Sequence, residues 1–157
     1  MFKARQVATV PKDAFAAHDF GPVDYVDCYC VQRAPGEPIE AVAERIFSPP
    51  GWVMFLMRAR EWIFVKPFGL KPSAARLAQT SGRIPMPVLQ RLENEIILGE
   101  NDAHLNFRVS ILRKRGEGAD EIYLTTKVRF NNRLGRAYFA IIKPFHKHVV
   151  KSMLARA

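Results

Sequence analysis

Residues Asn131–Ala157 read NNRLGRAYFAIIKPFHKHVVKSMLARA, and this closing stretch of the 157-residue chain decides the fold. At about 100° per residue, its apolar side chains form one predicted stripe made of Leu134, Tyr138, Ile141, Phe145, Val149 and Met153. Asn131 or Asn132 can cap the helix, and Pro144 should kink it because proline removes a backbone donor. The sequence therefore predicts one long amphipathic helix at the end of the chain.

Two long alternating segments come directly before this helix. Ala103–Arg113 carries on one face Leu105, Phe107, Val109 and Ile111, and on the other His104, Asn106, Arg108 and Ser110. Glu121–Phe130 alternates in the same way, with one face made of Ile122, Leu124, Thr126, Val128 and Phe130. Such alternation is typical of antiparallel strands that are buried on one side. We expect the apolar faces to lie against the last helix and the polar row to face solvent.

The rest of the chain divides into shorter elements within a single domain, 1–157. We predict a strand at Val23–Gln32, helices at Pro38–Phe47 and Gly51–Ile63, short strands at Val88–Leu92 and Glu95–Leu98, and a turn at Gly99–Asp102. Residues 1–20 are expected to form a weakly structured lead-in, and 73–87 an irregular connection. This order predicts an α+β fold of the helix-grip type, in which a curved antiparallel sheet wraps around the long C-terminal helix.

The composition is that of an ordinary globular protein, with 48% hydrophobic and 25% charged residues. The N-terminus lacks a signal-peptide pattern, and the apolar run Trp52–Met57 is much shorter than the roughly 20 residues that span a bilayer. We therefore expect a soluble, cytoplasmic protein. Cys28 and Cys30 are expected to be reduced thiols packed as small apolar groups, and we expect neither a metal nor a cofactor.

The net charge of +9 is concentrated at the end of the chain. Eight basic residues and no acidic residue follow Glu121. Four of them lie on the helix side opposite the apolar stripe, namely Arg136, Lys143, Lys147 and Lys151. We interpret this side as a solvated outer face and do not favour nucleic acid as a partner, although that alternative stays open. Peripheral contact with an anionic membrane stays open as an alternative, as does the oligomeric state.

Several short motifs resemble a bacterial family known only as a domain of unknown function. They lie within Val23–Ala157 and are Asn132–Phe139, Lys143–His146, Asp24–Asp27, Pro50–Trp52 and Asn101–Leu105. The resemblance implies membership of the START-like superfamily (SRPBCC, polyketide cyclase-like), which includes lipid carriers, polyketide cyclases and aromatic-ligand binders. It implies a helix-grip fold with a pocket between sheet and last helix. It carries over no catalytic residues.

Three function hypotheses follow from this sequence. The first is that a small hydrophobic or amphipathic molecule binds between sheet and last helix, in a cavity lined by Tyr138, Ile141, Phe145, Leu105, Phe107, Leu124 and Thr126. The second is an enzyme of the cyclase, hydrolase or isomerase type that acts on a carbonyl-containing small molecule in the same cavity. The third is a module that binds nucleic acid or an anionic membrane through its basic surface.

Asp27, His104 and His146 are the candidates for proton transfer in the second hypothesis. A structural interpretation stands beside each of them. Asp27 can be buried in an ion pair with an arginine such as Arg58 or Arg133. His104 can fasten the turn that precedes it, and His146 can be hydrogen-bonded near the helix kink.

Overall fold

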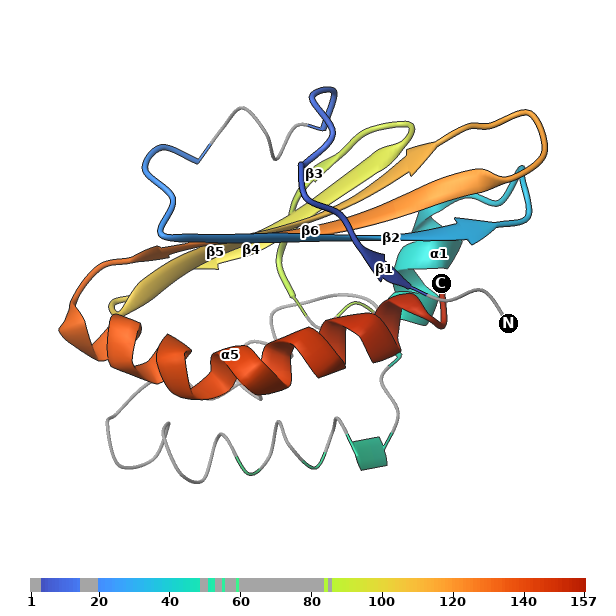
Figure 1. Ribbon diagram of the computed structural model, residues 1–157. Coiled ribbons are helices and arrows are strands. Elements are labelled where there is room, and N and C mark those ends of the chain that lie inside the picture. Colours follow the sequence, from blue (N-terminus) through green and yellow to red (C-terminus); the bar gives the residue numbers. More distant parts are fainter. Residues whose placement is uncertain are drawn as a thin grey trace.

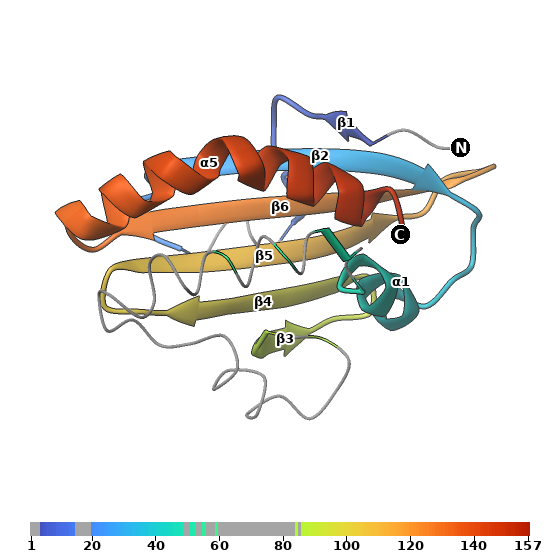
Figure 2. The same ribbon diagram turned by 90° about the horizontal axis from the view of Figure 1, so that it is seen from below.

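In the part of the chain that the structure describes, six antiparallel strands form one open sheet in the order β1-β2-β6-β5-β4-β3 (Figure 1). The computed structural model describes residues 4–14, 20–48, 51, 52, 55, 59, 84 and 86–157. The strands are β1 (Arg5–Gln6), β2 (Tyr25–Arg33), β3 (Val88–Arg91), β4 (Glu95–Asn101), β5 (Leu105–Lys114) and β6 (Asp120–Phe130). The helices α1 (Ile39–Ile46) and α5 (Arg133–Leu154) lie against the same face of the sheet, which we call the inner face (Figure 2).

This architecture confirms the predicted α+β class, with an open antiparallel sheet and a C-terminal helix in a helix-grip-like arrangement. The predicted turn at Gly99–Asp102 was placed too early, because β4 continues to Asn101. Gly99 pairs with Arg108 inside the strand, where a Cβ would overlap the backbone oxygen of Phe107. The prediction took Gly99 for a turn residue, whereas this glycine permits a close approach between two strands.

The second predicted helix, 51–63, is described only in part. Gly51, Trp52, Phe55 and Ala59 are helical, as predicted. The remainder of that range, including Arg58, lies outside the described residues, as does most of the predicted connection 73–87. No helix in the described part of the chain is long and apolar enough to cross a membrane.

The main apolar cluster fills the space between the inner face, α1 and the end of α5. It includes Ile39, Val42, Ile46, Ile96, Leu98, Ile111, Ile122, Leu124, Val150 and Leu154. Arg33 at the end of β2 fastens the end of α5, since its Nη2 donates to the carbonyl oxygens of Ala155 at 2.7 Å and Leu154 at 3.4 Å. The Leu154 carbonyl also accepts from the N–H of Ala157 at 3.1 Å, so the guanidinium adds a C-terminal cap at the end of the helix.

The stripe of α5 that faces the sheet differs from the predicted one. The residues turned inward include Gly135, Phe139, Ile142, His146, Val150 and Leu154. Two members of the predicted stripe, Tyr138 and Met153, also pack against the buried clusters. Ile141 and Phe145 are instead 52% and 55% exposed. At 3.6 residues per turn, the helix is rotated by roughly 80° from our prediction. The prediction ranked positions by hydrophobicity alone, whereas the observed stripe includes a glycine and a histidine.

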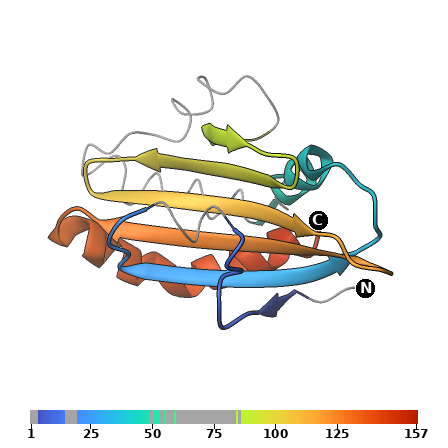
Figure 3. The ribbon, with the colours of Figure 1, turned by 90° about the horizontal axis from the view of Figure 1, so that it is seen from above.

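The N-terminal segment lies on the outer face of the sheet (Figure 3). β1 pairs with β2, and the backbone N–H of Val7 donates to the carbonyl of Cys28 at 2.8 Å. Ala14 is fully buried. Where the sequence predicted a weakly structured lead-in, the described residues thus contain a short edge strand. Cys28 and Cys30 are free thiols buried on this face, as predicted, and burial raises the pKa of both.

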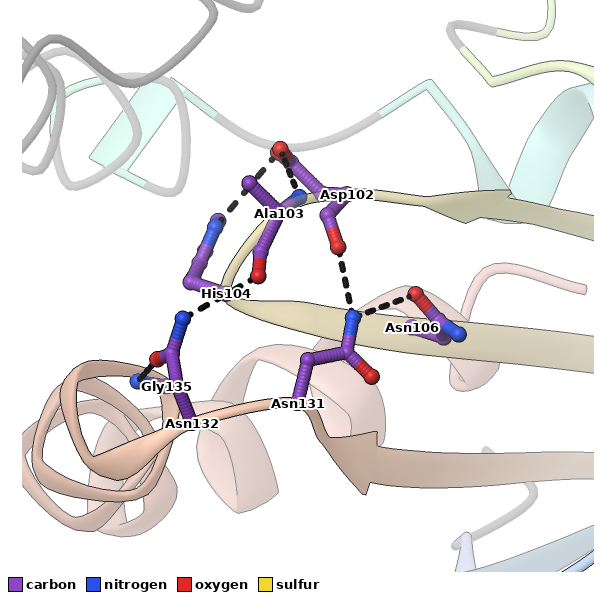
Figure 4. Close-up of polar contacts among 7 residues, drawn as sticks. All are labelled: Asp102, Ala103, His104, Asn106, Asn131, Asn132 and Gly135. Atoms are coloured by element: carbon purple, nitrogen blue, oxygen red, sulfur yellow. Dashed lines mark hydrogen bonds and ion pairs between the residues drawn. The ribbon is translucent and has the colours of Figure 1, made fainter.

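The start of α5 is fastened to the β4–β5 turn by asparagine side chains (Figure 4). Asn131 Nδ2 donates to the carbonyl oxygen of Asp102 at 2.7 Å, and Asn132 Nδ2 donates to that of Ala103 at 3.1 Å. Asn132 also caps the helix, because its Oδ1 accepts from the N–H of Gly135 at 2.9 Å. We call this set of contacts the turn–helix junction.

Gly135 is the tightest point of the junction. A Cβ at this position would overlap the backbone oxygen of His104, so only glycine lets the first turn of α5 approach the β4–β5 turn this closely. His104 is buried there, with its Nδ1 3.6 Å from Asp102 Oδ2 and its ring edge-on to Tyr138 at 5.3 Å. The turn and the helix therefore form one packed unit.

We expect Gly135→Ala to lower the free energy of unfolding by at least about 2 kcal/mol, because overpacking outweighs the gain of roughly 1 kcal/mol that alanine gives a helix. Gly118→Ala is the control, since a Cβ at Gly118 meets nothing within 4 Å. Urea unfolding followed by circular dichroism measures both. A Gly135→Ala variant as stable as the wild type would contradict the close approach.

Candidate functional site

A buried polar group lies on the inner face beneath the middle of α5. Asp27 of β2 pairs with Thr126 of β6, and both are almost fully buried. His146 of α5 points at Asp27, with its Nε2 3.3 Å from Asp27 Oδ2. We call Asp27, Thr126 and His146 the polar layer. They come from three elements that are far apart in the sequence.

The polar layer separates two apolar clusters. The main cluster lies toward α1, and a second cluster toward the turn–helix junction contains Leu105, Val128, Tyr138 and Phe139. On each of the three elements, the polar residue has a residue of the main cluster on one side and a residue of the second cluster on the other. In that order, the three sets are Tyr29–Asp27–Tyr25, Leu124–Thr126–Val128 and Val150–His146–Phe139. The core under α5 is therefore interrupted by polar side chains at one level.

Tyr25 and aromatic rings enclose the carboxylate of Asp27. The Tyr25 hydroxyl donates to Asp27 Oδ2 at 2.7 Å. Its ring lies 4.7 Å from that of Phe139 and 6.1 Å from that of His146, centroid to centroid. Burial, and then the neighbouring Asp27 carboxylate, raise the pKa of Tyr25 far above its ordinary value. Tyr25 is therefore a neutral hydrogen-bond donor throughout the physiological range.

Three buried atoms at this level have hydrogen-bonding capacity that the described residues do not use. They are Asp27 Oδ1, the Tyr29 hydroxyl and His146 Nε2, none of which makes a hydrogen bond within the described part of the chain. The 3.3 Å contact of His146 Nε2 with Asp27 Oδ2 is within ion-pair distance but lacks the geometry of a hydrogen bond. Burial and the Asp27 carboxylate raise the pKa of Tyr29 as well. Buried polar atoms are almost always satisfied in native proteins, because each one left unpaired costs about 1–3 kcal/mol. Three on one level are the strongest sign of a site in this structure.

The structure separates the candidate proton-transfer residues. It brings Asp27 and His146 together, and it places His104 in the turn–helix junction, where it fastens the turn as the structural interpretation stated. Asp27 is buried, as its structural interpretation stated, but it contacts His146 and not Arg133, which is exposed at the start of α5. Arg58, the other arginine named there, lies outside the described residues. His104 also leaves the predicted polar row, since it precedes β5 and is buried.

The predicted lining residues fall into two groups. Tyr138, Leu105, Leu124 and Thr126 are buried on the inner face, and Phe107 is half-buried there. Ile141 and Phe145 lie on the exposed flank of α5 that continues from Tyr138, on the side where the helix contacts the β4–β5 turn. That these residues line a cavity remains a prediction.

The predicted basic surface lies along the opposite flank of α5. Lys143 Nζ stands 5.2 Å from the Tyr25 ring centroid, and Lys151 Nζ stands 5.8 Å from that of Tyr29. The guanidinium of Arg136 lies 5.8 Å from the Phe130 ring. These cations therefore cover the aromatic side chains next to the polar layer. A partner for them, and for Lys147, stays an untested expectation.

Tyr25 and Tyr29 were not selected from the sequence. Their signal was available, because positions 25, 27 and 29 share one face of a strand and flank the buried aspartate. In the described part of the chain, no three His, Cys, Asp or Glu side chains come together as metal ligands.

The family model described as "Protein of unknown function (DUF2867)" matches residues 20–153, and the chain belongs to this family. No curated protein matches the sequence. The family assignment agrees with the resemblance carried by the motifs at the turn–helix junction and around Asp24–Asp27. It supplies no reaction.

We expect Asp27→Asn to change the free energy of unfolding by less than about 1 kcal/mol, or to raise it. Asparagine keeps an oxygen for the Tyr25 hydroxyl and removes a buried charge whose second oxygen is unsatisfied. Asp120→Asn is the matched control, because the buried carboxylate of Asp120 accepts from the N–H groups of Gly36 and Gly116. We expect this control to lose about 1–3 kcal/mol.

Both variants are measured by urea unfolding at pH 7. If Asp27→Asn lowers the free energy of unfolding more than Asp120→Asn does, then the Asp27 carboxylate is a structural group. The polar layer would then not be a functional site.

Proposed function

We propose that this DUF2867 family member binds a small amphipathic molecule between the sheet and α5, with the polar group of that molecule at the polar layer. The observation that carries the proposal is the set of three unsatisfied buried atoms, Asp27 Oδ1, Tyr29 OH and His146 Nε2. A ligand that hydrogen-bonds to them would remove the cost of burying them unpaired. We further infer a START-like fold, which the element order and the helix-grip-like arrangement support.

The chemistry of these atoms narrows the ligand class. Asp27 Oδ1 accepts hydrogen bonds, and the hydroxyl of Tyr29 can donate one. A carboxylate ligand would be repelled by the buried Asp27 charge. We therefore propose a ligand whose polar end carries a hydroxyl or amine, and whose apolar part contacts the two apolar clusters and the seven predicted lining residues.

Binding of 1-aminoanthracene, a neutral fluorescent probe with an apolar body and an amine, tests the proposal. We expect saturable binding to the wild type and an affinity at least about tenfold lower for His146→Gln, which corresponds to the loss of one hydrogen bond. His148→Gln is the matched control on the same helix, because His148 is exposed and its ring contacts only the Pro144 carbonyl among the described residues.

Native mass spectrometry of the purified protein tests for a natural ligand. A bound ligand would be detected as a mass above that of the 157-residue chain. Equal probe affinities of His146→Gln and His148→Gln, together with a mass spectrum of the bare chain, would exclude the proposed site.

A second candidate function is proton transfer on a bound carbonyl compound, which the 3.3 Å contact between His146 Nε2 and Asp27 Oδ2 favours. A histidine whose ring is oriented by a buried carboxylate can accept a proton, since the carboxylate stabilises the resulting imidazolium. In this scheme the neutral Tyr25 hydroxyl holds the carboxylate in place. Tyr29 would supply the hydrogen bond to the substrate oxygen.

Deuterium incorporation into cyclohexanone in D₂O, followed by proton NMR, tests this candidate. We expect the wild type to accelerate exchange and His146→Gln and Asp27→Asn each to lower the rate by about 10²–10⁴-fold, the usual contribution of a general base. Wild-type exchange no faster than that with His146→Gln would leave binding as the function of the site.

A further inference from the structure

Lys127 is a buried lysine on the outer face of the sheet, opposite to the polar layer. In β6 it pairs with Val26 of β2 on one side and with Arg108 of β5 on the other. Only 8% of its surface is exposed. Within the described part of the chain, no hydrogen bond or ion pair engages its ammonium group. Lysine is almost never buried to this degree without a partner.

The surroundings of Lys127 add positive charge. Arg108 lies directly opposite it in register, and Arg129 follows two residues later on the same face. The guanidinium of Arg108 stands 4.9 Å from the ring centroid of Phe20, and a Cβ at Gly21 would lie 3.9 Å from Arg129 Nη1. The chain at Phe20–Gly21 therefore crosses this face beside both arginines.

The position of Lys127 is electrostatically costly. Three cations share one patch of the outer face, and most of the side chain of the central one is buried. Burial lowers the pKa of Lys127, which is the expected response of an ammonium group without a counter-ion. An apolar residue of the same length would fill this place at lower cost, so the amine must contribute something other than packing.

We propose that Lys127 is the centre of a site for a small oxyanion, which takes the phosphate or carboxylate group of a small molecule on the outer face, with Arg129 as the second cation. The anion supplies the counter-charge that the Lys127 ammonium group does not find among the described residues, and forms a charge-assisted hydrogen bond with it. This site is independent of the polar layer, because it lies on the other side of the sheet and uses none of the same residues.

Inorganic phosphate and acetate are the probes, each titrated at constant ionic strength maintained with sodium chloride. We expect one of them to raise the unfolding temperature of the wild type in a saturable way, and the responding probe identifies the anion class. Lys127→Met should reduce the apparent affinity at least tenfold and, without anion, should be as stable as the wild type or more so. Lys147→Met on α5 is the matched control and should respond as the wild type does.

If Lys127→Met fails to fold, backbone amide NMR on the wild-type protein tests the proposal without a variant. The responding anion should shift the amides of Lys127, Val26 and Arg108 with one common saturation curve and leave those of α5 unchanged. Absence of a saturable effect with both anions would overturn the proposal. So would a Lys127→Met variant that keeps the wild-type response, since Lys127 would then be a lysine that only extends its amine to solvent.

Discussion

The close approach of Gly135 to the backbone of His104 is the constraint on which the rest of the structure depends. It sets the distance between the β4–β5 turn and the first turn of α5, and the side chains of Asn131 and Asn132 then fix the direction of the helix. The helix continues from this junction through Pro144 to His146, so the placement of its first turn helps to set the position of His146 over Asp27 three turns away. The residues of the turn–helix junction therefore act on the candidate site through geometry and not through contact.

The helix is held at both ends and is polar in the middle. Arg33 caps its last carbonyls, the turn–helix junction holds its first turn, and the level between them contains the carboxylate of Asp27 beneath His146. A continuous apolar stripe would stabilise such a helix more. Because the two ends already secure α5, the middle can carry unsatisfied polar atoms without loss of the fold. This is the usual relation between stability and a functional site.

The sequence predicted the architecture well because alternation and helical spacing are local signals. It placed β2, β5, β6, α1 and α5 to within about three residues at each end, an accuracy typical of long periodic elements. The prediction failed where contacts between residues distant in the sequence determine the structure. The helix is rotated because His146 and Gly135 face the sheet. Asp27 is paired with a histidine more than 100 residues away. Asp27 and His146 were both selected, but nothing in the spacing indicated that they meet or that His104 belongs elsewhere.

A high-resolution crystal structure of the protein purified under native conditions tests the central claim most directly. The account predicts electron density for a non-protein molecule within hydrogen-bonding distance of Asp27 Oδ1, with its apolar part directed toward the two apolar clusters. A side chain of the protein bonded to Asp27 Oδ1, with the clusters joined into one core across the polar layer, would contradict it.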